Sequence, residues 1–126
     1  MGLKVQFERS DEGVRAQVRP ARHFEGFEGV LQGGVVGGLM DDAMWYAIYA
    51  TNGTVTMTAE LTVRYKAPVP VETDLVVSAR VVEQRRHLFT CAANIHGPDG
   101  QLLAEAAGKF LTAPKELAER LKAQMG

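Results

Sequence analysis

The clearest pattern in the sequence is an alternation of apolar and polar residues between positions 55 and 65. Every odd-numbered residue of VTMTAELTVRY is apolar or aromatic, and every even-numbered one is Thr, Glu or Arg. Because successive side chains of a β-strand point to opposite faces, this period of two predicts a strand with one buried face. Pro68 and Pro70 follow closely and end the predicted strand.

Further strands are predicted on both sides of this segment. Downstream, the strand-like stretches are DLVVSARVVE, LFTCAANIH and QLLAEAAGKFL, separated by short turns around QRRH and GPDG. With residues 55–65 they are expected to form a four-stranded meander. Near the N-terminus, LKVQFERS and VRAQVRP flank the turn signal DEG and predict a short antiparallel pair.

A long helix is predicted between the two groups of strands. Residues 35–50 offer apolar side chains on nearly every helical face, which is typical of a helix buried on all sides. Pro114 then opens a C-terminal helix, PKELAERLKAQM. Consecutive strands favour an α+β fold with an antiparallel sheet over a parallel α/β fold. A helix buried on all sides requires that sheet to wrap around it.

Composition narrows the class of protein. The 126 residues fit one domain spanning 1–126. Fourteen basic and 15 acidic side chains leave a net charge of −1, which favours neither nucleic acid nor an anionic membrane as a partner. The first residues lack the apolar core of a signal peptide, so we expect a cytoplasmic protein. One cysteine and three histidines without metal-ligand spacing predict neither a disulfide nor a metal site.

Two adjacent acids, Asp41 and Asp42, interrupt the apolar helix. An ionised side chain is costly to bury unless it is paired or used, so the pair marks a candidate site. The two side chains point about 100° apart on a helix and cannot share one task. A pair of structural carboxylates held by backbone donors or by an arginine is the alternative interpretation.

The residues around Asp41 resemble those of the hotdog-fold acyl-CoA thioesterases, in particular the PaaI-like branch of the 4-hydroxybenzoyl-CoA thioesterase superfamily. That family carries Gly, two spacers and His-Gly-Gly, with Asp or Glu seven residues after the second Gly. The stretch GVLQGGVVGGLMD has the same spacing, and VRYKAPV matches the family's aromatic, spacer pair and Pro. Over residues 14–111 the resemblance implies a hotdog fold, an antiparallel sheet wrapped around one long central helix, plus a C-terminal helix.

The resemblance also implies an activity, hydrolysis of an acyl-CoA thioester to the free acid and coenzyme A. Coenzyme A is then part of the substrate, and no separate cofactor is needed. The Gly33 N–H at the helix start would polarise the thioester carbonyl. Asp41 would act as the nucleophile or as the base that activates water. Thr58, on the polar face of its predicted strand, would help to position that water, and a solvent-facing strand threonine is the alternative. Asp42 is then more readily explained as a hydrogen-bonded interface acid.

Three neighbouring positions would contact the thioester end of the substrate: Gly34, Gln32 and Gly26. Two of them depart from the family pattern, because Gln32 replaces the motif His and Gly26 replaces the Asn usually found six residues earlier. Arg85 and Arg86, in the predicted turn between two strands, have guanidinium groups suited to the phosphates of coenzyme A. A solvated turn is the alternative for this pair.

The spacing of Gly33 and Asp41 predicts an assembly. Eight residues at about 1.5 Å each separate them by about 12 Å along one helix, too far for one carbonyl to contact both. A second protomer must supply the other half, which agrees with the dimer-interface sites of the resembled family. We therefore expect a homodimer, assembled into a homotetramer.

Two other functions compete with hydrolysis. Gln32 and Gly26 leave open a non-catalytic acyl-CoA-binding hotdog protein. HFEG resembles the HFPG of the acyl-carrier-protein dehydratases, but these need a Glu fourteen residues after the His, where this chain has Gly37. A hydratase needs a His five residues after its Asp, and for Asp41 and Asp42 those positions hold Tyr46 and Ala47 instead. Both of these lyase functions are discounted.

Overall fold

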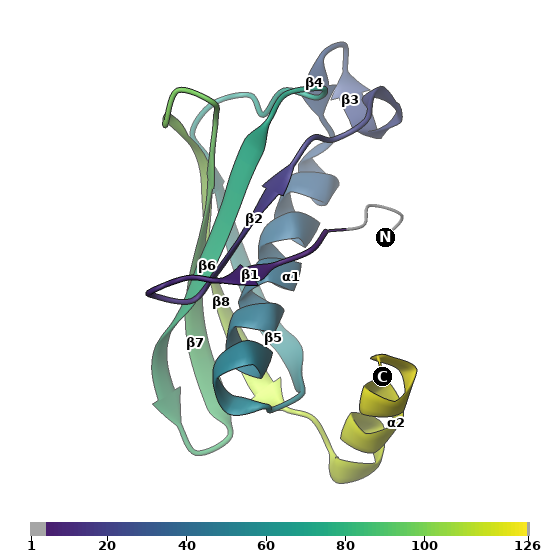
Figure 1. Cartoon of the computed structure of the whole chain (residues 1–126), viewed down its shortest axis with the longest axis vertical. Coiled ribbons are helices and arrows are strands. Elements are labelled where there is room, and N and C mark those ends of the chain that lie inside the picture. Colours follow the sequence, from purple (N-terminus) through teal and green to yellow (C-terminus); the bar gives the residue numbers. More distant parts are fainter. Residues whose placement is uncertain (1–4, 126) are drawn as a thin grey trace.

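The computed structural model describes residues 5–125 and shows an antiparallel sheet laid against one long helix (Figure 1). In chain order the elements are β1 (Glu8–Arg9), β2 (Val14–Val18), a 3₁₀ turn η1 (Arg22–Phe24), β3 (Glu25–Phe27), β4 (Val30–Leu31), α1 (Gly33–Asn52), β5 (Thr56–Tyr65), β6 (Leu75–Arg85), β7 (Leu88–His96), β8 (Leu102–Thr112) and α2 (Lys115–Met125). The predicted α+β class, the central helix and the C-terminal helix are confirmed. The N-terminal strand pair is confirmed as β1–β2, while Leu3 and Lys4 of its predicted first strand lie outside the described residues.

The sheet has the strand order β1-β2-β6-β7-β8-β5, with antiparallel neighbours throughout. The predicted meander is wrong at one connection, because β5 pairs with β8 at the sheet edge and not with β6. The chain after β5 crosses over so that β6 can pair with β2 in the interior. Charge supports the pairing of β5 with β8, since Glu60 lies opposite Lys109. Their side chains form an ion pair of 3.6 Å.

The core lies between α1 and the inner face of the sheet. Fully buried side chains come from α1 and from the strands that it covers: Leu39, Met40, Met44, Ile48, Leu75, Val77, Phe89, Ile95 and Phe110. The prediction that α1 is buried on all sides is wrong for the protomer. The sheet covers one face of the helix, and a stripe containing Gly33, Gly34, Asp42 and Tyr46 stays exposed. The α1 sequence therefore has apolar residues on more of its surface than the sheet of one protomer covers.

Local signals set the two ends of α1. The Gln32 side chain caps the N-terminus, with its Oε1 accepting a hydrogen bond of 3.0 Å from the Val35 N–H. Gly53 ends the helix in the left-handed conformation (φ 67°), which glycine adopts without strain. Its N–H donates to the carbonyl of Tyr49 at 2.8 Å. In Figure 1 α1 begins beside the small β3–β4 hairpin and ends towards α2.

The strand β5 departs most from its sequence pattern. The strict alternation predicts that Met57, Leu61 and Tyr65 share one buried face, but all three are exposed, by 40%, 37% and 54%. A β-bulge between Thr58 and Glu60 places an extra residue in the strand. A bulge exchanges the two faces of the strand for every later residue. Before the bulge, the even-numbered side chains of β5 therefore point towards α1, and after it the odd-numbered side chains do.

Within residues 5–125, none of the helices has both the length and the apolar character needed to cross a membrane.

Candidate active site

The first part of the site is the start of α1. Gly33 and Gly34 are exposed, and no hydrogen-bond acceptor for either N–H occurs among the described residues 5–125. Helix-start N–H groups of this kind carry partial positive charge and bind anionic or polarised oxygen atoms. Gly26 lies against Gln32, since a Cβ added at Gly26 would be 3.4 Å from the Gln32 Cα. The structure thus brings Gly26, Gln32, Gly33 and Gly34 together at the helix start.

Gln32 has a structural task that sequence reasoning missed. Its side-chain oxygen caps α1, and its backbone N–H donates to the Phe24 carbonyl at 2.9 Å. A Cβ at Gly34 would be only 2.9 Å from the Gln32 Oε1, so a glycine at that position leaves room for the cap. The residue that replaces the family's histidine therefore holds the helix start in shape. The preference for small polar N-cap residues gave no signal for a glutamine in this role.

A second contact at the helix start was also missed. The Tyr65 hydroxyl, from the end of β5, donates a hydrogen bond of 2.7 Å to the Gly33 carbonyl. In the sequence, Tyr65 stands out only as the motif aromatic and as part of a predicted buried strand face. The only sequence signal for a role of Tyr65 was that it is the aromatic residue of VRYKAPV. This motif did not indicate which group the Tyr65 hydroxyl would bind.

The second part of the site is Asp41, half-buried midway along α1. Its Oδ1 accepts a hydrogen bond of 2.8 Å from the Thr58 hydroxyl. The two residues therefore meet within one protomer. The alternating pattern places Thr58 on the polar face of its strand, away from the helix, and the structure differs from that expectation. The bulge after Thr58 turns its side chain towards α1.

Asp42 differs from Asp41 in its surroundings. It is classed as exposed, and no hydrogen bond or ion pair of its carboxylate occurs among the described side chains. Nearby protein still displaces part of its water. That partial burial raises the pKa of Asp42 above its ordinary value of 3.8, and repulsion by the Asp41 carboxylate raises it further. The predicted hydrogen-bonded acid has no partner within the described part of the protomer.

The two parts of the site lie along one side of the protomer. Thr58 of β5 meets α1 at Asp41, and Tyr65 of β5 meets it at Gly33. Helix and strand therefore run antiparallel, side by side, with the glycine face of the helix turned to the strand. A Cβ at Gly37 would be 3.5 Å from a methyl group of Val63, an ordinary contact. The structure joins each half of the site to β5 and leaves the halves about 12 Å apart, at 1.5 Å per helical residue.

The predicted phosphate-binding arginines lie away from both halves within the protomer. Arg85 ends β6, and Arg86 occupies the turn before β7 with a φ of 50°. This turn lies at the end of the molecule where α1 finishes, remote from Gly33 (Figure 1). The Arg85 Nε already contacts the Glu83 Oε1 at 2.5 Å, although both side chains are largely exposed.

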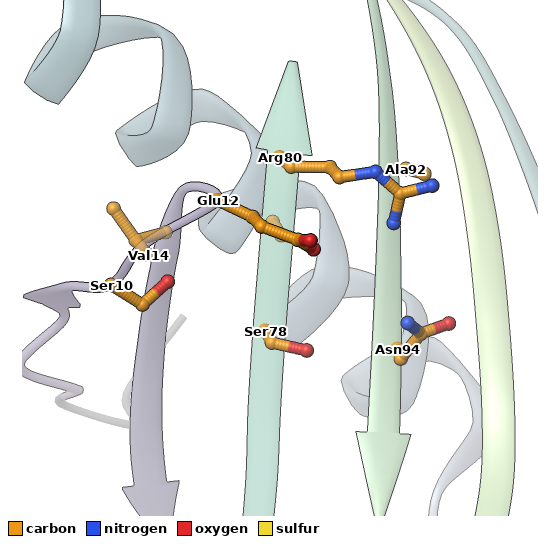
Figure 2. Close-up of a pocket in the computed structure, with 8 residues that line it drawn as sticks. Ser10, Glu12, Val14, Ser78, Arg80, Ala92 and Asn94 are labelled. Atoms are coloured by element: carbon orange, nitrogen blue, oxygen red, sulfur yellow. The ribbon is translucent and has the colours of Figure 1, made fainter. Parts of the chain in front are cut away.

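The outer face of the sheet offers a rival location. Figure 2 shows Arg80 reaching over Ala92 above Asn94 and Ser78, with the Glu12 carboxylate nearby. This hollow has a volume of about 100 Å³, room for a few water molecules and too little for an acyl-CoA. An adjoining hollow of about 450 Å³ has a floor of alanines and contains neither Asp41 nor the helix start. The chemistry of the lining residues therefore favours the α1–β5 side.

The remaining reactive groups do not form a site. Cys91 is buried, and burial raises the pKa of its thiol to about 12, so it stays protonated and unreactive near neutral pH. Among residues 5–125, no three His, Cys, Asp or Glu side chains cluster in a way that could hold a metal ion.

Two curated proteins resemble this chain in sequence. The acyl-coenzyme A thioesterase THEM4 of Xenopus laevis is 28% identical over 108 residues, 83% of this chain and 47% of its own length. THEM4 of Bos taurus is 29% identical over 75% of this chain and 38% of its own length. The chain thus spans about half the length, or less, of the curated relatives that it matches.

Solved structures share the fold. The crystal structure of a thioesterase superfamily protein aligns with a TM-score of 0.78 and 30% identity, covering 85% of this chain and 53% of that one. A Streptococcus mutans protein bound to acetyl-CoA aligns with a TM-score of 0.82 and 16% identity, covering 91% and 93%. The predicted hotdog fold is confirmed. Residues 28–104, which include the helix start, Asp41 and Thr58, match the Thioesterase superfamily, and the chain belongs to that family.

Proposed function

We propose that this protein hydrolyses an acyl-CoA thioester to a free acid and coenzyme A, as a PaaI-like member of its superfamily. The observation that carries the proposal is the half-buried Asp41 carboxylate held by the Thr58 hydroxyl at 2.8 Å. The exposed N–H groups of Gly33 and Gly34 on the same helix supply donors for an oxyanion. The acetyl-CoA held by the Streptococcus mutans structure supports a CoA thioester as the substrate class.

Asp41 has two chemical routes. As a nucleophile, its carboxylate attacks the thioester carbonyl carbon, the C–S bond breaks and coenzyme A leaves as the thiolate. Water then hydrolyses the mixed anhydride and regenerates Asp41. As a general base, Asp41 instead takes a proton from a water that attacks the same carbon. In both routes the Gly33 N–H stabilises the oxyanion, and one water is consumed per acid released.

The site needs two protomers, and β5 supplies the geometry. This strand ends the sheet, so one of its edges has no strand partner within residues 5–125. Two copies that pair antiparallel along β5 bring the Tyr65 end of one next to the Thr58 end of the other. Gly33 of one protomer then approaches Asp41 of its partner. We propose this homodimer as the catalytic unit, assembled further into a homotetramer.

The same pairing gives the arginines a role. The β6–β7 turn lies at the Asp41 end of β5, so in the dimer it is on the side of the partner's helix start. Arg85 and Arg86 are proposed to bind the phosphates of coenzyme A from there. Replacing both by alanine should raise KM more than it lowers kcat, because these groups are remote from the reacting carbon. An unchanged KM would reject the assignment.

The test of the main proposal is hydrolysis of a panel of aryl, short, medium and long acyl-CoA thioesters by the purified protein. Asp41→Asn keeps the shape of the side chain but removes its charge, so kcat should fall by about two to four orders of magnitude. Asp42→Asn is the matched control and should change kcat little. Thermal melting and size-exclusion chromatography check that both variants fold. Equal activity in wild type and Asp41→Asn would contradict the proposal.

A non-catalytic acyl-CoA-binding protein is the second candidate. The observation in its favour is Gln32, which caps the helix in place of the family's histidine. Saturable binding of acyl-CoA with no release of coenzyme A would favour this candidate over hydrolysis.

A further inference from the structure

Tyr65 makes a long-range hydrogen bond although its side chain is largely exposed. It ends β5 at the edge of the sheet, and 54% of its surface is exposed. Its hydroxyl nevertheless donates a hydrogen bond of 2.7 Å to the Gly33 carbonyl, 32 residues earlier in the chain. The hydroxyl lies close to two glycines of α1, since a Cβ at Gly33 would be 3.5 Å from it and one at Gly37 would be 3.9 Å away, both ordinary contacts.

This bond acts on the backbone atoms that the proposed reaction needs. The Gly33 carbonyl and the Gly34 N–H belong to one planar peptide unit, so fixing the carbonyl also fixes the direction of that N–H. Rotation about the Gly33 backbone moves the Gly33 N–H relative to this plane as well. Two successive glycines have the greatest conformational freedom of any pair, and neither carries a side chain that could hold the first turn. Here the Tyr65 hydroxyl supplies that restraint from outside the helix.

We propose that Tyr65 is a positioning residue that orients the oxyanion donors at the start of α1. The inference rests on the proposed hydrolysis and deepens it. Tyr65 acts through the Gly33–Gly34 peptide and needs no contact with the reacting atoms. Donor groups contribute most when they are already aimed at the developing charge, so a loosened first turn lowers kcat. Substrate binding depends mainly on the rest of the acyl-CoA and should change little.

The test is Tyr65→Phe, which removes one oxygen atom and keeps the ring. Tyr49→Phe is the matched control, because it removes the same atom near the other end of α1, where Tyr49 stacks on Trp45. We expect kcat to fall about tenfold in Tyr65→Phe with KM within about twofold, a smaller loss than the hundredfold or more for deleting an oxyanion donor. Tyr49→Phe should match wild type in both constants.

A second measurement is independent of turnover. In ¹⁵N–¹H spectra, the Gly34 amide resonance should move in Tyr65→Phe and stay in place in Tyr49→Phe. An unchanged Gly34 resonance, or an unchanged kcat in an active enzyme, would overturn the positioning role. If the wild-type protein has no turnover, the proposed function is refuted. The spectra can still be recorded in that case, because they do not require activity. An equal loss of kcat in both variants would also overturn the inference.

Discussion

Strands β7 and β5 flank β8 on its two sides, and both alternate in sequence, yet their surroundings are opposite. In β7 every second side chain is buried, from Phe89 to Ile95. In the ten residues of β5 only Thr56 is buried. The difference comes from position, because β7 has a strand on each side and α1 across its inner face, whereas β5 ends the sheet. Alternation therefore predicts a strand without indicating its place in the sheet.

The exposed strand β5 is also the one that contacts both halves of the candidate site. Exposed apolar side chains on an open sheet edge favour association, and natural proteins usually protect such edges. Here Met57, Leu61 and Tyr65 remain exposed in the protomer, on the strand that contacts both halves of the site. The side chains of β7 are buried by the folding of one chain. We propose that the exposed apolar side chains of β5 are buried when two chains associate.

The largest expected effect is on stability, and it tests the difference in burial between β7 and β5. Phe89→Ala on β7 removes a ring that is 1% exposed and should lower the free energy of unfolding by about 3–5 kcal/mol. Leu61→Ala on β5 removes a side chain that is 37% exposed and should cost about 1 kcal/mol in the isolated protomer. Urea titrations followed by circular dichroism measure both. Equal losses in a monomeric sample would contradict the assigned burial of the two strands.

A smaller effect tests the chemistry of β5 itself. Thr58→Val removes the hydroxyl that donates to Asp41 and keeps the shape of the side chain. A hydrogen bond to a charged group contributes about 1.5 kcal/mol, so kcat should fall about tenfold. Thr62→Val is the control on the outward face of the same strand, opposite Ala107. Steady-state kinetics that found the same loss in both variants would show that β5 affects activity only through stability.

The smallest effect concerns Asp42, on the exposed side of α1. Its raised pKa means that, between pH 3.8 and that raised value, the folded chain binds more protons than the unfolded one. Stability therefore falls as the pH rises through this window and stays lower above it. Asp42→Asn should raise Tm at pH 7, and the advantage should vanish below about pH 3.8. A lower Tm at pH 7 would show that the carboxylate has a stabilising partner in the assembled protein.

The contrast between the strands also explains how far the sequence could predict the fold. The α+β class, the long helix and the strands β6 to β8 depend on local periodicity and turn residues, which are visible in one chain. The place of β5 depends on long-range pairing with β8, which local patterns do not contain. The exposed stripe of α1 was missed for a related reason. Its apolar residues, such as Tyr46, favour burial in the sequence pattern, and nothing in that pattern indicates that the sheet leaves this face exposed in the protomer.

For the candidate site, the family resemblance singled out Gly33, Asp41 and Thr58 as candidates. It did not reveal the bulge that turns Thr58 towards Asp41, because an inserted strand residue looks like any other residue in an alternating sequence. Nor did it reveal that Gln32 caps the helix and that Tyr65 binds Gly33. Those contacts depend on how a strand end and a helix start meet in three dimensions.

We propose that one active site is built from Gly33 of one protomer and Asp41 of its partner. Two variants that each disable one half allow a complementation test. Asp41→Asn removes the carboxylate charge. Gly33→Pro removes the N–H, at the first helical position where proline is favoured. The extended conformation of Gln32 (φ −60°, ψ 135°) suits a residue that precedes proline.

The most direct measurement is thioesterase activity after the two inactive variants are unfolded together, mixed in equal amounts and refolded. Half of the dimers then contain one chain of each kind. In these mixed dimers one site receives both intact groups and the other receives neither. Our account predicts recovery of about one quarter of the wild-type activity from the mixture and almost none from either variant alone. A mixture as inactive as its components, with mixed dimers verified by mass spectrometry, would contradict the two-protomer site.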